Sequence, residues 1–297
     1  MTKGNFIMLA NKTLYNHLES GDTYIKNISD KITYILSYLD CKTDRMGKSN
    51  FSIEDMVLCS GLKVDTHKGK SVDQFRQVLK LMQDKGFLED VEVDFLKVKP
   101  KDYISCVLNK QIPKNENGDY YWFFELDTEL FLKLFYNTKT KNNKINLLNV
   151  YCYLFSRMTH YDDSDICLNG GANVCFPNRD TILEDLGIKS QLLDNCLKEL
   201  KDLGLIVYDN IGYVQKDKKV KIANNVYSTD ITYLKSGLKK SKEFYENDGW
   251  KLLNKKTQKI VRQLNGTKGA IKKLNNEGKD TSKLEKKKER LEYSLAK

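Results

Sequence analysis

The sequence predicts a mostly helical α+β fold made of two related domains and a basic helical tail. Three observations lead to this expectation. Apolar residues recur at helical spacing beside short runs typical of strands, one block of sequence occurs twice, and positive charge is concentrated toward the C-terminal end. With 297 residues, 40 % of them hydrophobic, the chain is long enough for two ordinary domains with packed cores.

The clearest helical pattern lies in the stretch from Phe176 to Val214. A short helix is expected from Asn178 to Gly187, followed by a tight turn and a second helix that begins at Ser190. The apolar positions of the second helix recur every three or four residues and define its buried face: Leu192, Leu193, Cys196, Leu197, Leu200 and Leu203. Gly204 has the permissive backbone that usually ends such a helix.

Two strands are expected to follow this helix. Leu205 to Tyr208 and Ile211 to Val214 have strand character, and Asp209-Asn210 between them is typical of a hairpin turn. Helix, tight turn, helix and hairpin is the order of a winged helix-turn-helix, whose second helix typically enters the major groove of DNA.

The same order occurs earlier in the chain. QVLKLMQDKGFL (residues 77–88) aligns without a gap on NCLKELKDLGLI (residues 195–206), with a shared Leu-Lys pair, Asp and Gly and an apolar pair after the Gly. Upstream, a helix capped by Ser52 ends at Gly61, a second runs from Ser71 to Lys85, and a hairpin is expected from Phe87 to Val98. The repeat predicts tandem winged-helix domains.

The remaining elements complete two domains and a tail. Expected outside the repeats are strands at Tyr24–Ile28, Tyr121–Leu126, Val174 and Val220–Tyr227, and helices at Ile32–Leu39, Asp127–Phe135 and Ile145–Thr159. We expect an N-terminal winged-helix domain at 1–110, a linker at 111–119, a second winged-helix domain at 120–234 and a basic helical tail at 235–297. Gly266 and Gly269 are expected to interrupt the tail helices.

The net charge of +10 is uneven. Residues 235–297 hold nineteen Lys or Arg against eight Asp or Glu, a net of +11, which leaves thirty-one basic against thirty-two acidic residues, a net of −1, for residues 1–234. The tail is therefore either a solvated helical extension or an arm that binds the DNA backbone or a partner.

Patterns that would indicate catalysis, a metal or a cofactor fail on inspection. Gly47-Lys48-Ser49 and Gly69-Lys70-Ser71 lack the earlier glycine of a phosphate-binding loop. His17, His67 and His160 are too dispersed for a metal-dependent nicking site, and Cys167, Cys175 and His160 fit no common zinc spacing. We expect no enzyme activity, no metal and no cofactor.

Three features of the sequence predict the cellular compartment of the protein. No apolar run approaches the roughly 18 residues of a membrane span, and the N-terminal residues lack the pattern of a secretion signal. The seven cysteines are odd in number and form no CxxC pair, which favours reduced thiols. We expect a cytoplasmic protein without a membrane partner.

Candidate DNA-binding residues lie on the outer faces of the two repeated helices and at their starts. In the second copy, Gln191 and Asn195 are one turn apart, and such amides can pair with adenine. The complete set is Lys68, Lys70, Ser71, Gln74 and Gln77 in the first copy, and Lys189, Ser190, Gln191, Asn195 and Lys198 in the second.

The stretch from Phe124 to Val214 resembles the initiator domain of plasmid replication proteins from Gram-positive bacteria, and that of phage replisome organisers. The segments that carry the resemblance are FELDTELF, NVYCYLFSRM, VCFPNRDTILEDLGI and LKELKDLGLI. The resemblance implies binding to repeated origin sequences in double-stranded DNA, recruitment of host replication proteins, and no catalysis. The basic tail is not part of that pattern. A transcriptional regulator with the same domains and a non-enzymatic interaction or assembly module remain alternatives, and a homodimer remains open.

Overall fold

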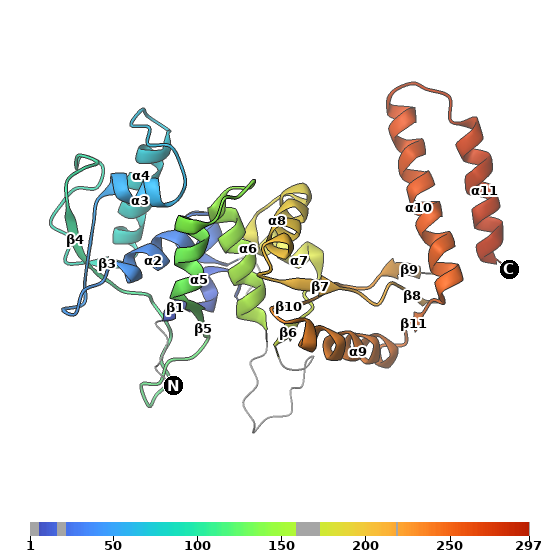
Figure 1. Ribbon diagram of the computed structural model, residues 1–297, viewed down its shortest axis with the longest axis horizontal. Helices are drawn as coiled ribbons and strands as arrows, with labels where there is room; N and C mark the ends of the chain where they lie inside the picture. The colour runs from blue at the N-terminus through green and yellow to red at the C-terminus, as the bar shows by residue number, and fades with distance from the viewer. Residues whose placement is uncertain (1–5, 17–21, 159–172, 218, 297) are drawn as a thin grey trace.

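The structure, a computed structural model, describes residues 6–16, 22–158, 173–217 and 219–296. It is an α+β fold in which helices make up about half of the chain and the strands form small antiparallel sheets. The last two helices, α10 (Lys255–Asn276) and α11 (Ser282–Ala296), project from the rest of the chain on one side (Figure 1).

An N-terminal unit has the expected helices, together with a strand before α3, β2, that the sequence did not predict. It comprises α2 (Ile32–Cys41), β2 (Lys48–Phe51), α3 (Ile53–Cys59), α4 (Ser71–Asp84), β3 (Leu88–Glu89) and β4 (Ile104–Leu108). Ser52 caps α3 as predicted, since its hydroxyl accepts a hydrogen bond from the Asp55 N–H. The last strand lies in the middle of the sheet, in the order β2-β4-β3.

A central unit repeats that plan. It comprises α6 (Lys144–Arg157), β6 (Val174–Cys175), α7 (Arg179–Leu186), α8 (Ser190–Asp202), β7 (Val207–Asp209) and β10 (Val226–Ser228). Asn178 caps α7, and Gly187 ends it in the left-handed region. The sheet order is β6-β10-β7, so the last strand is again in the middle.

The two aligned helices end in the same way. Gly86 after α4 and Gly204 after α8 have φ of 74° and 70°. In each case the N–H of the residue after the glycine donates to the carbonyl five residues earlier: Phe87 to Met82 and Leu205 to Leu200, both at 2.9 Å. This is a Schellman ending, which the shared glycine makes possible. The repeat seen in the sequence is therefore a repeat in backbone geometry.

The two units share one hydrophobic core. α2 packs against α6, and β1 (Phe6–Ala10), a strand that the sequence did not predict, pairs antiparallel with β5 (Phe123–Asp127). Between the units lie α5 (Thr128–Leu132), which Asp127 caps, and a π-helical turn, η2 (Lys133–Asn137). The ring centre of Tyr34 in α2 lies 4.8 Å from the ring centre of Phe135.

The predicted hairpin from Phe87 to Val98 is wrong. β3 pairs instead with β4, which begins six residues beyond Val98. The reason is that Phe95 is buried in the core and Arg76 of α4 donates a hydrogen bond to the Val98 carbonyl. These two anchors hold the segment as a loop over α4, and the chain returns to the sheet later.

The hairpin predicted across Asp209-Asn210 is also wrong. β7 pairs with β10, and the segment between them leaves the sheet as a separate hairpin of β8 (Tyr213–Lys216) and β9 (Lys219–Ile222), bordered by β11 (Lys251–Leu252). Asn210 Nδ2 donates to Asn225 Oδ1 at 2.9 Å, which closes the neck of this insertion. The single strand expected at Val220–Tyr227 is thus divided between β9 and β10.

The structure also differs from the prediction near the start of the chain. Tyr24–Asn27 forms one helical turn, α1, where a strand was expected, after the 3₁₀ turn η1 (Asn11–Thr13). The Thr23 hydroxyl accepts a hydrogen bond from the Lys26 N–H and so caps this turn.

The C-terminal helices are more continuous than the sequence predicts. α9 (Ile231–Asn247) covers the sheet of the central unit, where Gly237 lies so close to Val174 and Val226 that an added Cβ would come within 2.8 Å of a Val226 methyl. α10 (Lys255–Asn276) then forms an antiparallel hairpin with α11 (Ser282–Ala296). α10 runs through Gly266 and Gly269 without a break, because buried side chains on both sides of them, from Val261 to Ile271, pack in one face.

Substituting alanine for both of these glycines should stabilise the hairpin. Neither glycine has a positive φ, and no atom lies within 4 Å of an added Cβ. Each change should therefore contribute roughly 1 kcal/mol to the stability of the helix. Slower hydrogen exchange of the α10 amides in Gly266→Ala/Gly269→Ala is the expected result; faster exchange would mean that the helix needs a break there.

Candidate nucleic-acid interface

α8 presents the polar row that its sequence predicts. Lys189, just before the helix, and Ser190, Gln191, Asn195 and Lys198 are all exposed. Gln191 Nε2 donates a hydrogen bond to Asn195 Oδ1 at 3.1 Å, which joins the two amides one turn apart. The Gln191 amide oxygen and the Asn195 amide N–H groups are then the acceptor and donor that the major-groove edge of adenine can pair with.

Arg179 of α7 holds the first turn of α8. Its guanidinium donates to the Ser190 hydroxyl at 2.7 Å and forms an ion pair with Asp194 at 2.8 Å. Asp194 is an exposed carboxylate next to Asn195, and the ion pair offsets its charge. Ser190 consequently acts in this structure as a contact between α7 and α8, a role that its sequence position alone does not indicate.

A basic loop lies against the C-terminal half of α8. The Glu199 carboxylate accepts hydrogen bonds from the backbone N–H groups of Lys141 and Asn142, at 2.5 and 2.9 Å. This fixes a groove of about 430 Å³ whose lining includes Lys139, Lys141 and Lys198. Sequence reasoning missed the two loop lysines, because only the packing of the loop on Glu199 brings them beside α8.

α4 differs from α8 in how its polar side chains are used. Lys68 and Lys70 are exposed, but the Ser71 hydroxyl donates to the Lys63 carbonyl at 2.7 Å and accepts from the Asp65 N–H at 3.0 Å. Gln74 donates to the carbonyl of Gly69 at 2.9 Å, and Gln77 to the carboxylate of Asp73 at 3.0 Å. Ser71 and Gln74 thus hold the loop before α4.

A cluster of charged and aromatic side chains packs against the end of α7. Asp185, the penultimate residue of α7, accepts a hydrogen bond from the Tyr153 hydroxyl at 2.7 Å and forms an ion pair with Arg157 at 3.1 Å. The Arg157 guanidinium lies 4.3 Å from the centre of the Tyr15 ring and 4.8 Å from that of Tyr153. Burial, the main cause, raises the pKa of the Tyr153 hydroxyl, which keeps it as a donor to the carboxylate.

Removing the carboxylate of Asp185 should weaken the central unit. Asp185→Ala leaves Arg157, whose side chain is only 26 % exposed, without its charged partner. We expect a loss of roughly 2–3 kcal/mol in the free energy of unfolding, somewhat below the cost of breaking a fully buried pair. Urea unfolding against Glu184→Ala, an exposed site on the same helix, measures the difference. Equal midpoints for the two variants would contradict this account of the cluster.

No arrangement of side chains typical of a metal site occurs in the described ranges, where no three His, Cys, Asp or Glu residues are grouped. His17, His160 and Cys167 lie outside these ranges. The six cysteines that are described are free thiols. Burial raises the pKa of Cys41 and Cys106 to about 11 and that of Cys196 to about 12, which makes these thiols poor nucleophiles.

Two observations bear on the class of protein. Within the described part of the chain, none of the helices combines the length and the apolar character that crossing a membrane requires. No protein-family model matches the chain, and the search of curated proteins finds no significant match. The functional assignment therefore depends on the geometry of the site.

Proposed function

We propose that both units are winged helix-turn-helix domains and that the chain binds double-stranded DNA through α4 and α8. The observation that carries this proposal is the repeated architecture: helix, strand, helix, helix and two strands, with the last strand in the middle of each sheet. In this fold the third helix is the one that enters the major groove. α4 and α8 occupy that position; both expose amides, and exposed lysines precede both helices.

The segments between the last two strands of each unit correspond to the wings. In the N-terminal unit this is the loop from 90 to 103, and in the central unit it is the insertion that carries the β8–β9 hairpin (Figure 1). Lys216, Lys219 and Lys221 lie on that hairpin. Lys216 pairs with Asp248 at 3.2 Å and Lys221 lies 4.3 Å from the Trp250 ring centre, so of these three lysines Lys219 is the best suited to contact a phosphate.

Cations beside the helices suit contacts to phosphates, and the amides suit contacts to bases. Lys68 and Lys70 precede α4, Lys189 precedes α8, and Lys139 and Lys141 flank the far end of α8. Phosphate contacts of this kind position a protein on the duplex, and amide contacts to base edges specify the sequence. Because Gln74 and Gln77 of α4 hold their own loop and helix, α8 is the stronger reader of the two.

The role we propose for this binding is initiation of replication of a plasmid or related mobile element. The resemblance of the segments between Phe124 and Ile206 to initiator domains supports it, and so does the tandem arrangement, which suits repeated sites at an origin. Host replication proteins are the partners this role requires. No cofactor and no catalytic step by this chain are part of the proposal.

Selection of bound DNA from a library of random and plasmid fragments tests the role. Direct repeats clustered in one intergenic region would support initiation, whereas a single operator beside a promoter would favour the transcriptional regulator. Failure to retard any duplex at 50 mM salt would contradict DNA binding and favour an interaction module.

Removing the amides of α8 should abolish most of the preference for the selected sequence. Gln191→Ala/Asn195→Ala loses base contacts worth about 1–3 kcal/mol each, so affinity for the selected DNA should fall at least tenfold. Affinity for unrelated duplex should change less than threefold, because phosphate contacts remain. Fluorescence anisotropy measures both, with Asn117→Ala in the exposed loop after β4 as the control. Equal losses on both DNAs would refute base reading by α8.

A further inference from the structure

The outward face of α10 carries a row of basic side chains. Lys255, Lys259, Arg262 and Lys273 are exposed. Together with Gly266 and Gly269 they fall within an arc of about 80° when residues are placed at 100° intervals around the helix. The residues buried on α10 lie on the opposite side: Val261, Leu264, Thr267 and Ile271. We call the six positions from Lys255 to Lys273 on the exposed side the α10 stripe.

The charge of the stripe is not offset by neighbouring acids. Residues 255–276 contain seven basic and no acidic residues, and the whole hairpin at 255–296 contains thirteen basic against five acidic, a net of +8. The hairpin carboxylates that form ion pairs do so with other lysines: Glu292 with Lys268, Glu277 with Lys279, and Glu285 with Lys288. In the described part of the chain no ion pair involves the basic side chains of the stripe.

The glycines leave the middle of the stripe without side chains. A glycine in a helix interior destabilises it, and nothing near Gly266 or Gly269 requires one, because no atom lies within 4 Å of an added Cβ. A molecule that binds along the stripe can therefore approach the helix backbone closely between Arg262 and Lys273. Arg262 precedes the two glycines and Lys273 follows them along the helix.

We propose that the α10 stripe binds the sugar–phosphate backbone of duplex DNA without reading its sequence. This rests on the proposed DNA-binding function and assigns to the tail phosphate contacts in addition to those of the two units, since residues 1–234 carry a net charge of only −1. Lys255 and Lys273 are about 27 Å apart along the helix, which is about four-fifths of one turn of duplex, roughly 34 Å. Lysine and arginine donate hydrogen bonds and accept none, which suits them to phosphate oxygens.

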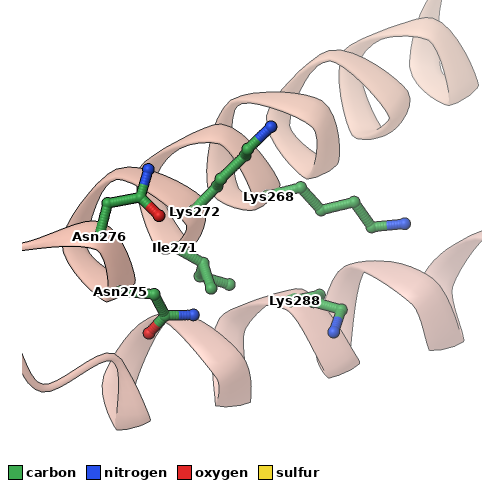
Figure 2. A pocket seen from close by; sticks show the side chains of 6 residues that line it. All are labelled: Lys268, Ile271, Lys272, Asn275, Asn276 and Lys288. Atoms are coloured by element: carbon green, nitrogen blue, oxygen red, sulfur yellow. The ribbon is translucent and has the colours of Figure 1, made fainter. Parts of the chain in front are cut away.

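Two alternatives are a binding site in the cleft between α10 and α11 and a membrane as the partner of the stripe, and the structure favours neither. Figure 2 shows the cleft between α10 and α11, lined by Lys268, Lys272 and Lys288 among others, but Lys268 and Lys288 already pair with carboxylates. A membrane surface would need an exposed apolar face on α10 beside the cations. That face is used inside the hairpin, where Val261, Leu264 and Ile271 are buried. The stripe therefore favours a polyanion without apolar chains.

The test removes four charges from the stripe and compares an equal loss on α11. The stripe variant is Lys255→Gln/Lys259→Gln/Arg262→Gln/Lys273→Gln. The control is Lys283→Gln/Lys286→Gln/Lys287→Gln/Arg290→Gln, whose side chains are exposed on the other helix. Circular dichroism checks that both variants keep the helix content of the parent chain. Dissociation constants for the selected DNA and for an unrelated duplex are measured by anisotropy from 50 to 200 mM salt.

The stripe variant should bind both DNAs more weakly by a similar factor, about tenfold or more at the higher salt. Its plot of log affinity against log salt should be shallower by about 3–4, and that of the control by less than about 1. Gly266→Ala/Gly269→Ala should also weaken both DNAs while keeping the fold.

Distinct results would overturn the inference. Equal effects of the stripe and control variants would mean general attraction by the tail, and unchanged binding by the stripe variant would refute the stripe while leaving the proposed function intact. If the parent chain bound no duplex DNA, both the stripe proposal and the proposed function would be refuted. Binding to vesicles of anionic phospholipid that competes with DNA at equal lipid phosphate would assign the stripe to a membrane instead.

Discussion

The packing of α2 against α6 is the contact on which the rest of the structure depends. Each is the first helix of its unit, and their contact, reinforced by the β1–β5 sheet and by the ring of Tyr34 against that of Phe135, makes two small units into one core. A unit of this size would be only marginally stable alone. Because the core is shared, α4 and α8 are held in a fixed relation. A protein that recognises a pair of DNA sites at a defined spacing requires such a relation.

Local sequence predicted the helices well and the strand pairing poorly. Helix periodicity, the cap Ser52 and the glycine that ends each aligned helix depend only on neighbouring residues. The sequence alone could therefore show the repeat, and the two aligned helices end in the same hydrogen bonds. Both hairpins were misplaced, because the partner of β3 and of β7 is decided by distant anchors such as Phe95 and the Asn210–Asn225 contact. β1 was missed for the same reason.

The sequence predicted which helices form the candidate site, but not the hydrogen bonds and ion pairs that their polar side chains make. Exposure of Gln191, Asn195 and Lys198 follows from the apolar face of α8. Periodicity cannot show that Ser71 holds a loop, that Arg179 offsets the charge of Asp194, or that Glu199 brings Lys141 beside α8. These contacts join residues from separate elements. The continuity of α10 was likewise hidden, because glycine propensity predicts a break where packing against α11 sustains the helix.

Hydroxyl-radical footprinting of the full chain on its selected DNA tests the central claim most directly, namely that the two units are copies of one DNA-reading domain held in a fixed relation. The account predicts two protected patches on one face of the duplex, about one helical turn or 34 Å apart, one for α4 and one for α8. A single patch that persists unchanged whichever of the two helices is altered would contradict it.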